Sequence, residues 1–389
     1  MRYGVIGAGR QGTAAGYDMA VHGDAQEVIL ADRDLIVAQR AAARINSLVG
    51  RSVAVAEEID VANEDALVGL VGPLDVFLCA TPFVLIPGCT RAAIAAGTGM
   101  VDLGGHTATV LDQLDLDEEA RAAQIAIVPD CGMGPGLNNT LALAAVERLR
   151  EQGAVPREAR VWDGGLPQDP KEPWRYALFF HINGLTNEYD GTALVLRDGE
   201  VSEVDTLTEF ETLEFDDLGT LEAFVTSGGT STVPYTMAGE LEVYENKTLR
   251  YPGHYAAFRA FKDLGLFSMD PVDVGGTPVV PRDLYHALLG PQLEGDDVHD
   301  VCVMRAEAIG VRGGRDVSVR FELVDRYDPE TGFSAMERLT GWHAAIMAEL
   351  IARGEVPVGV HPVERAVSPL RFLEEVRARG FDLRECARR

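Results

Sequence analysis

Two glycine-rich stretches of the chain have the composition of loops that bind anions. The first is "GAGRQG" at residues 7–12, and the second is "TSGGTST" at residues 226–232. Backbone N–H groups in such loops, and at the start of a helix that follows one, can hold a phosphate or a carboxylate. The chemistry therefore depends on which anion each loop receives, a cofactor phosphate or a group on a substrate.

The first stretch is placed as a dinucleotide-binding loop requires. It follows the β-rich run "YGVIG" and precedes a helical segment that stops at Gly23. A second β-rich run, residues 27–31, then ends at Asp32, twenty residues beyond Gly12. This βαβ arrangement with a distal acidic residue is the context in which the glycine fingerprint indicates a dinucleotide site.

Each part of this loop has a physical task. Gly7 permits the tight turn, Gly9 lets the backbone approach a pyrophosphate, and Gly12 lets the helix pack close to the sheet. Arg10 and Gln11 lie at the start of the helix, where free N–H groups meet the pyrophosphate charge, and are expected cofactor contacts.

The residues after the second β-rich run bear on the choice of cofactor. Asp32 would accept hydrogen bonds from the adenosine ribose and repel a 2′-phosphate, which favours NAD over NADP. Arg33 is the alternative signal, because an arginine at this place can bind that phosphate. We therefore expect NAD, with NADP possible.

Further β-rich runs alternate with helical segments and predict a doubly wound parallel sheet of the Rossmann type. Ligands bind such sheets beyond the carboxyl ends of the strands. The further cofactor contacts expected there are Asp60, Val61, Cys79, Ala80, Thr81, Pro82, Asp102 and Met133. Asp102 and Asp130 each end a strand beside the expected nicotinamide position, so each is a candidate base or ammonium ligand. The alternative for both is to cap the next helix or turn.

The pattern changes from about residue 150 onward to alternating strands with turn signals. Residues 197–200, "RDGE", are typical of a β-hairpin turn. We predict an α/β fold with three parts: a dinucleotide-binding domain at 1–131, a second α+β domain of mainly antiparallel strands at 132–336, and helices at 337–389 that pack back on the first domain. The second domain is expected to bind substrate and to form a dimer.

Composition excludes several classes of function. A net charge of −27 over 389 residues argues against a nucleic-acid partner, because a polyanion would be repelled. Solubility, or adaptation to high salt, accounts for this charge. The five cysteines contain no CxxC pair, so neither a disulfide framework nor a metal site is expected. No apolar run is long enough to span a membrane, and "MRYGVIGAG" enters a strand at once, so we expect a cytoplasmic protein without a signal peptide.

Several segments together resemble the saccharopine dehydrogenase family over nearly the whole chain. They are "VPDCGMGPGLNNTLA", "GGLPQDP", "LEAFVTSGGTSTVPYT", "LRYPGHYAAFRAFKDLGLF" and "LTGWHAAI". The chain is most similar to the L-lysine 6-dehydrogenase branch. The resemblance implies oxidation of an amine by NAD(P), often in a homodimer. In the lysine branch the ε-amino group leaves as ammonia, and the 2-aminoadipate 6-semialdehyde closes to a cyclic imine.

That reaction needs a base and a carboxylate ligand, because hydride leaves a carbon only when its amine is neutral. An ε-ammonium has an unperturbed pKa of about 10.4 and must lose a proton. His254, in "RYPGH", is the candidate base, with a structural hydrogen bond in its turn as the alternative. Arg250, in the same segment, would bind the substrate carboxylate through its planar fork. His181, expected in an apolar strand, is a substrate contact or a satisfied core residue.

The second glycine-rich stretch remains available for the substrate, because residues 7–12 already hold the pyrophosphate. The N–H groups of Gly228 and its neighbour, with the hydroxyls of Ser227 and Thr230, could form a neutral nest for a carboxylate. Glu222, just upstream, could meet an ammonium. The alternative is a tight turn whose hydroxyls satisfy the local backbone.

Two other functions fit the same residues. A saccharopine-type or carboxyspermidine-type enzyme would join or split two larger amine fragments and would need a second carboxylate site. A non-catalytic NAD(H)-binding sensor would keep the fold without turnover.

Overall fold

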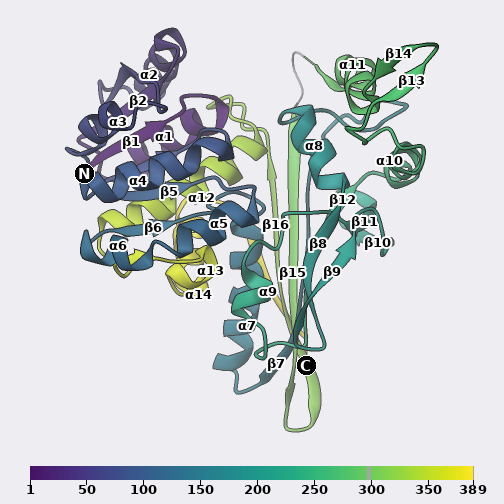
Figure 1. Ribbon diagram of the computed structural model, residues 1–389. Helices are drawn as coiled ribbons and strands as arrows, with labels where there is room; N and C mark the ends of the chain where they lie inside the picture. The colour runs from purple at the N-terminus through teal and green to yellow at the C-terminus, as the bar shows by residue number, and fades with distance from the viewer. Residues whose placement is uncertain (296–298, 389) are drawn as a thin grey trace.

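The computed structural model describes residues 1–295 and 299–388, and two large sheets organise it (Figure 1). The first sheet has seven strands, all parallel, in the order β17-β6-β5-β4-β1-β2-β3. Its strands are β1 (Arg2–Ile6), β2 (Glu27–Asp32), β3 (Ala54–Glu58), β4 (Val76–Cys79), β5 (Gly99–Asp102), β6 (Ala126–Val128) and β17 (Gly359–Val360). The predicted doubly wound parallel sheet is confirmed.

Helices alternate with these strands, as the sequence pattern predicts. They are α1 (Arg10–His22), α2 (Leu35–Val49), α3 (Glu64–Val71), η1 (Phe83–Leu85), α4 (Ile86–Ala96), α5 (Thr107–Leu114) and α6 (Asp117–Ala122). Buried side chains occupy four of five positions in β1 and four of six in β2. Such continuous apolar strands are typical of a parallel sheet covered on both faces.

The second sheet is mostly antiparallel, in the order β10-β11-β12-β7-β15-β16-β18; β8 also pairs with β12, and β9 pairs with β8. Its strands are β7 (Val155–Pro167), β8 (Thr192–Arg197), β9 (Glu200–Asp205), β10 (Glu211–Phe215), β11 (Gly219–Val225), β12 (Val243–Arg250), β15 (Asp300–Arg312), β16 (Arg315–Arg326) and β18 (Leu383–Arg388). Among the described strands of this sheet, only β12 and β7 pair in parallel. Arg197 pairs with Glu200 across the β8–β9 turn, which confirms the predicted hairpin.

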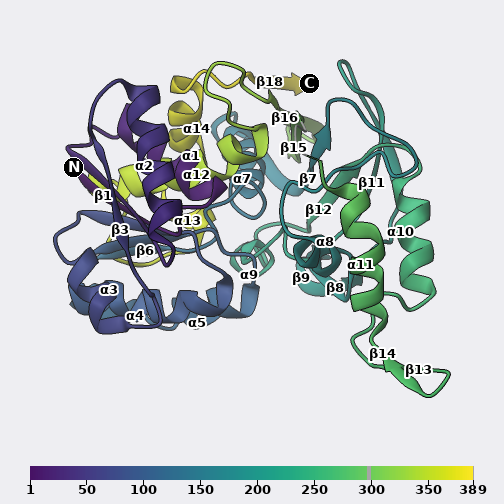
Figure 2. The ribbon, with the colours of Figure 1, turned by 90° about the horizontal axis from the view of Figure 1, so that it is seen from above.

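Short helices surround this sheet. They are α7 (Leu137–Glu151), α8 (Ile182–Tyr189), α9 (Val233–Thr236), α10 (His254–Asp263) and α11 (Pro281–Leu293). A separate hairpin of β13 (Val272–Val274) and β14 (Thr277–Val279) extends away from α10 and α11 (Figure 2). The second part of the chain is therefore α+β, as expected.

One predicted strand is wrong. The stretch around His181 contains α8, and His181 is an exposed residue that caps this helix by accepting a hydrogen bond from Asn183 N at 3.1 Å. The apolar side chains before it, Tyr176 and Phe179, pack into an aromatic cluster from an irregular segment. The stretch is apolar because these side chains are buried in the cluster, and not because they belong to a paired strand.

The last part of the chain returns to both sheets. Its elements are α12 (Ala335–Ala352), β17, α13 (Val363–Ala366), α14 (Pro369–Ala378) and β18. Helix α12 lies directly against α1, because a Cβ on Gly341 would come 2.7 Å from the carbonyl oxygen of Gln11 and 2.8 Å from Ala15 N. Strand β17 joins the first sheet, whereas β18 pairs with β16 of the second. The segment 337–389 is thus not confined to the first domain.

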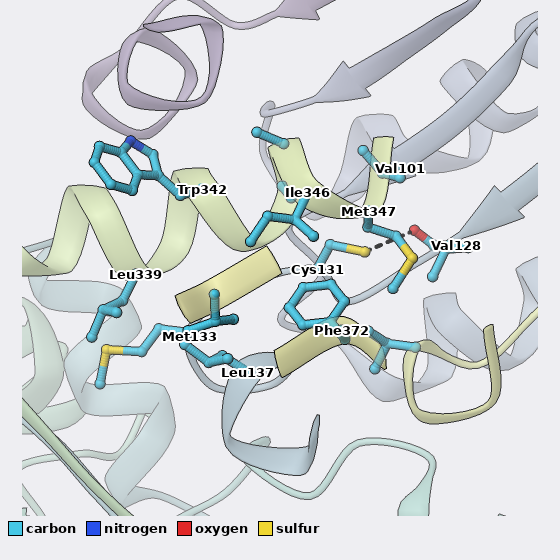
Figure 3. Close-up of a cluster of buried hydrophobic side chains, with 14 of the residues drawn as sticks. Val101, Val128, Cys131, Met133, Leu137, Leu339, Trp342, Ile346, Met347 and Phe372 are labelled. Carbon is cyan, nitrogen blue, oxygen red and sulfur yellow. Dashed lines mark hydrogen bonds between the residues drawn. The ribbon is translucent and has the colours of Figure 1, made fainter. Parts of the chain in front are cut away.

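A shared core joins these elements. Figure 3 shows Cys131 beside α12 and Phe372, with its Sγ donating to the carbonyl of Val128 at 3.3 Å. Met133, in the same close-up, continues the buried cluster toward Leu339 of α12. Burial raises the pKa of the Cys131 thiol well above its ordinary value, so this residue packs as a small neutral side chain. Among the described residues, no helix has the length and apolarity to cross a membrane.

Candidate active site

A cavity of about 240 Å³ lies between the dinucleotide loop and the second sheet. One wall comes from the first part of the chain, with Gln11 of α1 and Met133 after β6. The opposite wall is the face of β7 and β12, and the segment 176–188 closes one side. The cavity therefore borders the nucleotide-binding end of the first sheet, where such folds bind the reacting part of a cofactor.

Strand alternation places the polar residues of β12 in this cavity. Asn246, Thr248 and Arg250 are at every second position and so point to one face of the sheet. Strand β7 contributes Asp163, the register neighbour of Thr248. The two strands approach closely at Gly164, where a Cβ would come 2.4 Å from the carbonyl oxygen of Leu249.

Asp163 is a buried carboxylate at the cofactor side of the cavity. Its Oδ1 accepts a hydrogen bond from Asn246 Nδ2 at 2.6 Å. A Cβ on Gly134, the residue after Met133, would come 2.6 Å from Asp163 Oδ2, so this carboxylate reaches the dinucleotide side. Burial raises its pKa to about 6, against the opposing effects of the Asn246 hydrogen bond and the charge of Arg250.

Arg250 and Glu188 form the other charged group. Their closest atoms, Nη2 and Oε2, are 3.6 Å apart, and the guanidinium lies 4.8 Å from the centre of the Tyr176 ring. About a third of the Glu188 side chain (34%) remains accessible through the cavity. Burial raises the pKa of Glu188 to about 7, while the positive charge of Arg250 opposes this shift. Burial alone would lower the pKa of Arg250. The interactions with Tyr189, Tyr176 and Glu188 outweigh this effect of burial, so the pKa of Arg250 is raised.

The residues of the first loop fit a dinucleotide. Gly7 has φ +103°, and a Cβ there would come 2.5 Å from the carbonyl oxygen of Ala80. A Cβ on Gly12 would come 2.0 Å from the oxygen of Gly7, whereas Gly9 has open space in front of it. Gln11 Oε1 is buried without a hydrogen-bond partner and belongs to a residue that faces the cavity. The loop thus has both the close packing and the open approach that a pyrophosphate needs.

The other predicted cofactor contacts surround this loop. Asp32 ends β2, and its Oδ2 accepts from Ala8 N at 3.0 Å. Arg10 is exposed and its Nε donates to Glu337 at 2.7 Å. Cys79 is buried with its Sγ 3.2 Å from Thr81 Oγ1. Arg33, Asp60 and Pro82 are exposed as well, and Val61, Ala80 and Thr81 are half-buried.

Most hydroxyls of the second glycine-rich loop bond to the protein's own groups. Ser227 lines the cavity, but its Oγ donates to the carbonyl of Asn187 at 2.8 Å. Thr230 Oγ1 donates to the carbonyl of Leu194 at 2.7 Å. Ser231 donates to the Asp130 carboxylate. Gly228, with φ +89°, makes the turn.

The same loop holds a second buried carboxylate of this chain. Thr232 Oγ1 donates to Glu364 Oε1 at 2.9 Å, and Thr236 donates to the same oxygen at 2.7 Å. The loop is therefore an anion-binding loop whose anions are carboxylates of the protein. The predicted nest for a substrate carboxylate does not account for its hydroxyls.

Several predicted site residues lie outside the cavity. The Glu222 carboxylate accepts from Gly253 N and Tyr255 N at 2.9 and 3.0 Å and so caps α10. His254 is buried behind Tyr189, whose hydroxyl is 2.9 Å from its Nε2. His181 is the exposed cap of α8.

Asp102 and Asp130 are also buried away from the cavity lining. Asp102 accepts from Gly104 N at 2.8 Å and from Gln113 Nε2 at 2.8 Å, and burial raises its pKa to about 7. Asp130 accepts from Gly105 N at 3.2 Å, and burial raises its pKa as well. Both carboxylates hold the loops that follow the strands, which is the capping role considered as their alternative.

Sequence reasoning missed most of the cavity lining, including the polar residues Asp163, Tyr176, Glu188 and Asn246. One signal was present. Asp163 is a single carboxylate in the apolar run "ARVWDGGLP", and a buried acidic residue in a strand requires a partner or a function. Of the residues that the structure describes, no group of three or more His, Cys, Asp or Glu is arranged to hold a metal ion.

The fold and this cavity are those of a dinucleotide-binding protein with charged side chains beside the cofactor end of its first sheet. Residues 3–128 match the family model described as saccharopine dehydrogenase NADP binding domain, and residues 132–381 match the saccharopine dehydrogenase C-terminal domain. The chain therefore belongs to the saccharopine dehydrogenase family of NAD(P)-dependent oxidoreductases.

Relatives agree with this assignment. The chain is 23% identical over 273 residues to saccharopine dehydrogenase (NADP+, L-glutamate-forming) of Saccharomyces cerevisiae, a match covering 67% of this chain and 58% of that protein. It is 26% identical over 239 residues to mitochondrial alpha-aminoadipic semialdehyde synthase of Bos taurus, covering 58% of this chain and 25% of that one. The match thus spans less than two thirds of the length of either relative.

A solved structure shares the whole fold. Apo histidine-tagged saccharopine dehydrogenase (L-Glu forming) from Saccharomyces cerevisiae superposes with a TM-score of 0.82, over 100% of both chains and at 18% identity.

Proposed function

We propose that the protein is an NAD-dependent L-lysine 6-dehydrogenase. The observation that carries this proposal is the charge pattern of the cavity. Among the described residues that line it, Arg250 is the only cation, and Asp163 and Glu188 are the two carboxylates. L-Lysine has the complementary pattern, with one carboxylate and two ammonium groups.

The arrangement of these charges supports one orientation of lysine. Arg250 binds the substrate carboxylate as a bidentate fork, and Glu188 beside it accepts from the α-ammonium. Asp163 and Asn246 receive the ε-amine at the cofactor side, where Gly134 approaches the Asp163 carboxylate. Lysine thereby brings each of its charges to an opposite charge in a buried site, which buried ions require.

Asp163 is the group we assign as the base. An ε-ammonium of pKa about 10.4 gives up its proton more easily when it is desolvated in a buried site. Burial also raises the pKa of Asp163 to about 6, so both shifts reduce the difference between donor and acceptor. Asp163 then holds the proton while the amine nitrogen supplies electrons to the forming C=N bond. A nicotinamide dinucleotide held at residues 7–12 supplies the hydride acceptor.

NAD is the proposed cofactor because of Asp32. Its half-buried carboxylate ends β2, where the adenosine ribose binds in this type of fold. A negative charge there disfavours a 2′-phosphate. The homodimer that the family resemblance implies stays a prediction.

The first test is formation of reduced cofactor by the purified protein with NAD and L-lysine at alkaline pH. Ornithine, saccharopine and NADP are the comparisons, and o-aminobenzaldehyde traps the cyclic imine. Turnover of lysine with formation of the trapped imine is expected. Turnover of saccharopine without turnover of lysine would reject the proposal.

Saccharopine cleavage is the second candidate, because the relatives named above include a saccharopine dehydrogenase that forms L-glutamate. Saccharopine has three carboxylates and would need further cations besides Arg250. The release of glutamate, measured in the same assay, separates this reaction from lysine oxidation.

A further inference from the structure

We propose that His254 is a positioning residue that acts through Tyr189 on Arg250, and that it fixes the guanidinium that binds the substrate carboxylate. This inference rests on the proposed function for the identity of the substrate. It assigns to His254 a role different from the base that its sequence context suggests.

The three residues form a chain of hydrogen bonds with a fixed direction. Arg250 Nε lies 2.8 Å from the Tyr189 hydroxyl, and that hydroxyl lies 2.9 Å from His254 Nε2. A guanidinium can only donate, so the tyrosine oxygen must accept from it. The single hydroxyl proton of Tyr189 is then directed to His254 Nε2, which must be the unprotonated nitrogen of the ring. Nδ1 must then carry the ring proton, and it is buried without a hydrogen-bond partner among the described residues.

The histidine ring is held by aromatic contacts. It stacks on Phe258 with ring centres 4.0 Å apart and planes 12° from parallel. The rings of Tyr176 and Tyr189 meet it edge-on at 5.2 and 5.7 Å. Rotation of the imidazole would break these contacts, so the acceptor nitrogen keeps its direction toward Tyr189.

The charges around His254 favour its neutral form. The titratable groups that face it are Tyr176, Tyr189 and Arg250. Burial lowers the pKa of His254 well below its ordinary value, and the positive charge of Arg250 lowers it further. A neutral imidazole that accepts from Tyr189 and has no place in the cavity lining cannot take a proton from the substrate directly.

Arg250 is thereby fixed at two points. Nε is held by Tyr189, and Nη1 donates to the carbonyl of Leu249 at 2.9 Å. The remaining N–H groups of its five donors face Glu188 and the cavity. A bidentate bond to a carboxylate depends on the plane of the guanidinium, so loss of either fixed point should weaken substrate binding more than chemistry.

The test compares Tyr189→Phe, His254→Phe and the double variant by steady-state kinetics. Each single variant is expected to raise KM for lysine about 10- to 100-fold, with kcat reduced less than about threefold. The double variant should be little worse than either single one, because the residues act in series. Tyr285→Phe is the matched control from the same aromatic cluster, and His254→Gln should recover part of the affinity because it retains an acceptor.

A second readout needs no substrate. Nitrogen NMR of the eight histidines should show His254 as the neutral Nδ1–H tautomer across the pH range in which free imidazole titrates, and Tyr189→Phe should change its Nε2 signal. A protonated Nε2, or a His254→Phe variant that loses kcat and the acid limb of the pH profile at unchanged KM, would overturn the proposal. If the protein oxidises saccharopine and not lysine, the KM comparison is made with saccharopine. In that case the proposed lysine dehydrogenase function is rejected, while the KM values for saccharopine still test the positioning role of His254.

Discussion

Replacement of Asp102 by asparagine should make the protein more stable at high pH. Asp102 was a candidate catalytic residue, yet it is completely buried, and the neighbours that act on its carboxylate in the described structure are Gln113, Asp130 and Gly104, none of them basic. Its carboxylate accepts hydrogen bonds from two backbone N–H groups, at Gly104 and Asp130, and from Gln113. The Gln113 oxygen has no partner and can accept from the new amide after the side chain turns.

The size of the effect follows from the pKa. Burial raises the pKa of Asp102 from an ordinary 3.8 to about 7, and each unit corresponds to about 1.4 kcal/mol. A carboxyl whose pKa is raised in the folded state contributes stability below 3.8, and this contribution is lost as the pH rises through 7. The variant should therefore gain about 2 to 4 kcal/mol relative to the parent above pH 7, and much less in acid.

Urea unfolding of Asp102→Asn and the parent chain at several pH values measures this difference. The comparison between the two curves isolates one carboxyl from the other buried acids. The steepness of the transition must be the same in both proteins. If the free energies of unfolding of the two proteins change in parallel with pH, the reasoning about burial is refuted. A large loss of kcat with unchanged stability would indicate that Asp102 takes part in the reaction.

Three further predictions concern the cavity and the cofactor. Asp163→Asn should lower kcat about 100- to 10,000-fold with little change in KM, and it should remove the fall of activity below about pH 6. The control is Asp325→Asn, at a buried carboxyl on β16, which should change neither kcat nor the pH profile. Arg250→Lys should raise KM for lysine about 10- to 100-fold at nearly constant cofactor affinity, because an ammonium cannot replace the planar fork; unchanged KM would remove Arg250 from the carboxylate site. Asp32→Ala should improve the use of NADP relative to NAD about tenfold or more in competition assays, and an unchanged ratio would contradict the role of its charge.

The first sheet was predictable from sequence because its signals are local. The loop at 7–12, its flanking strand and helix, and Asp32 all fall within one βαβ unit. The hairpin at 197–200 is equally local. In contrast, the segment before α8 is apolar because it packs in an aromatic cluster, and its periodicity alone does not reveal a helix.

The cavity was harder to predict, because distant segments build it. Asn246 and Asp163 are 83 residues apart in the chain and become neighbours only through the parallel pairing of β12 with β7. Arg250 was recognised from its residue type, but its fixed orientation depends on Tyr189, 61 residues away. Likewise, Ser231 and Thr232 find their carboxylates 101 and 132 residues away, so their hydroxyls seemed available for a ligand.

The loop at 226–232 has a consequence for how a ligand enters. Asn138 Nδ2 donates to the carbonyl of Gly229 at 2.9 Å, and Ser231 donates to the carboxylate of Asp130. These two hydrogen bonds join the two walls of the cavity along one edge. The same loop also contacts the segment 176–188, because Ser227 Oγ donates to the carbonyl of Asn187 at 2.8 Å and Ser227 N donates to the carbonyl of Glu188 at 2.9 Å. This one loop thus holds together the first part of the chain, the second sheet and the segment 176–188, so a wider opening of the cavity would have to break its bonds.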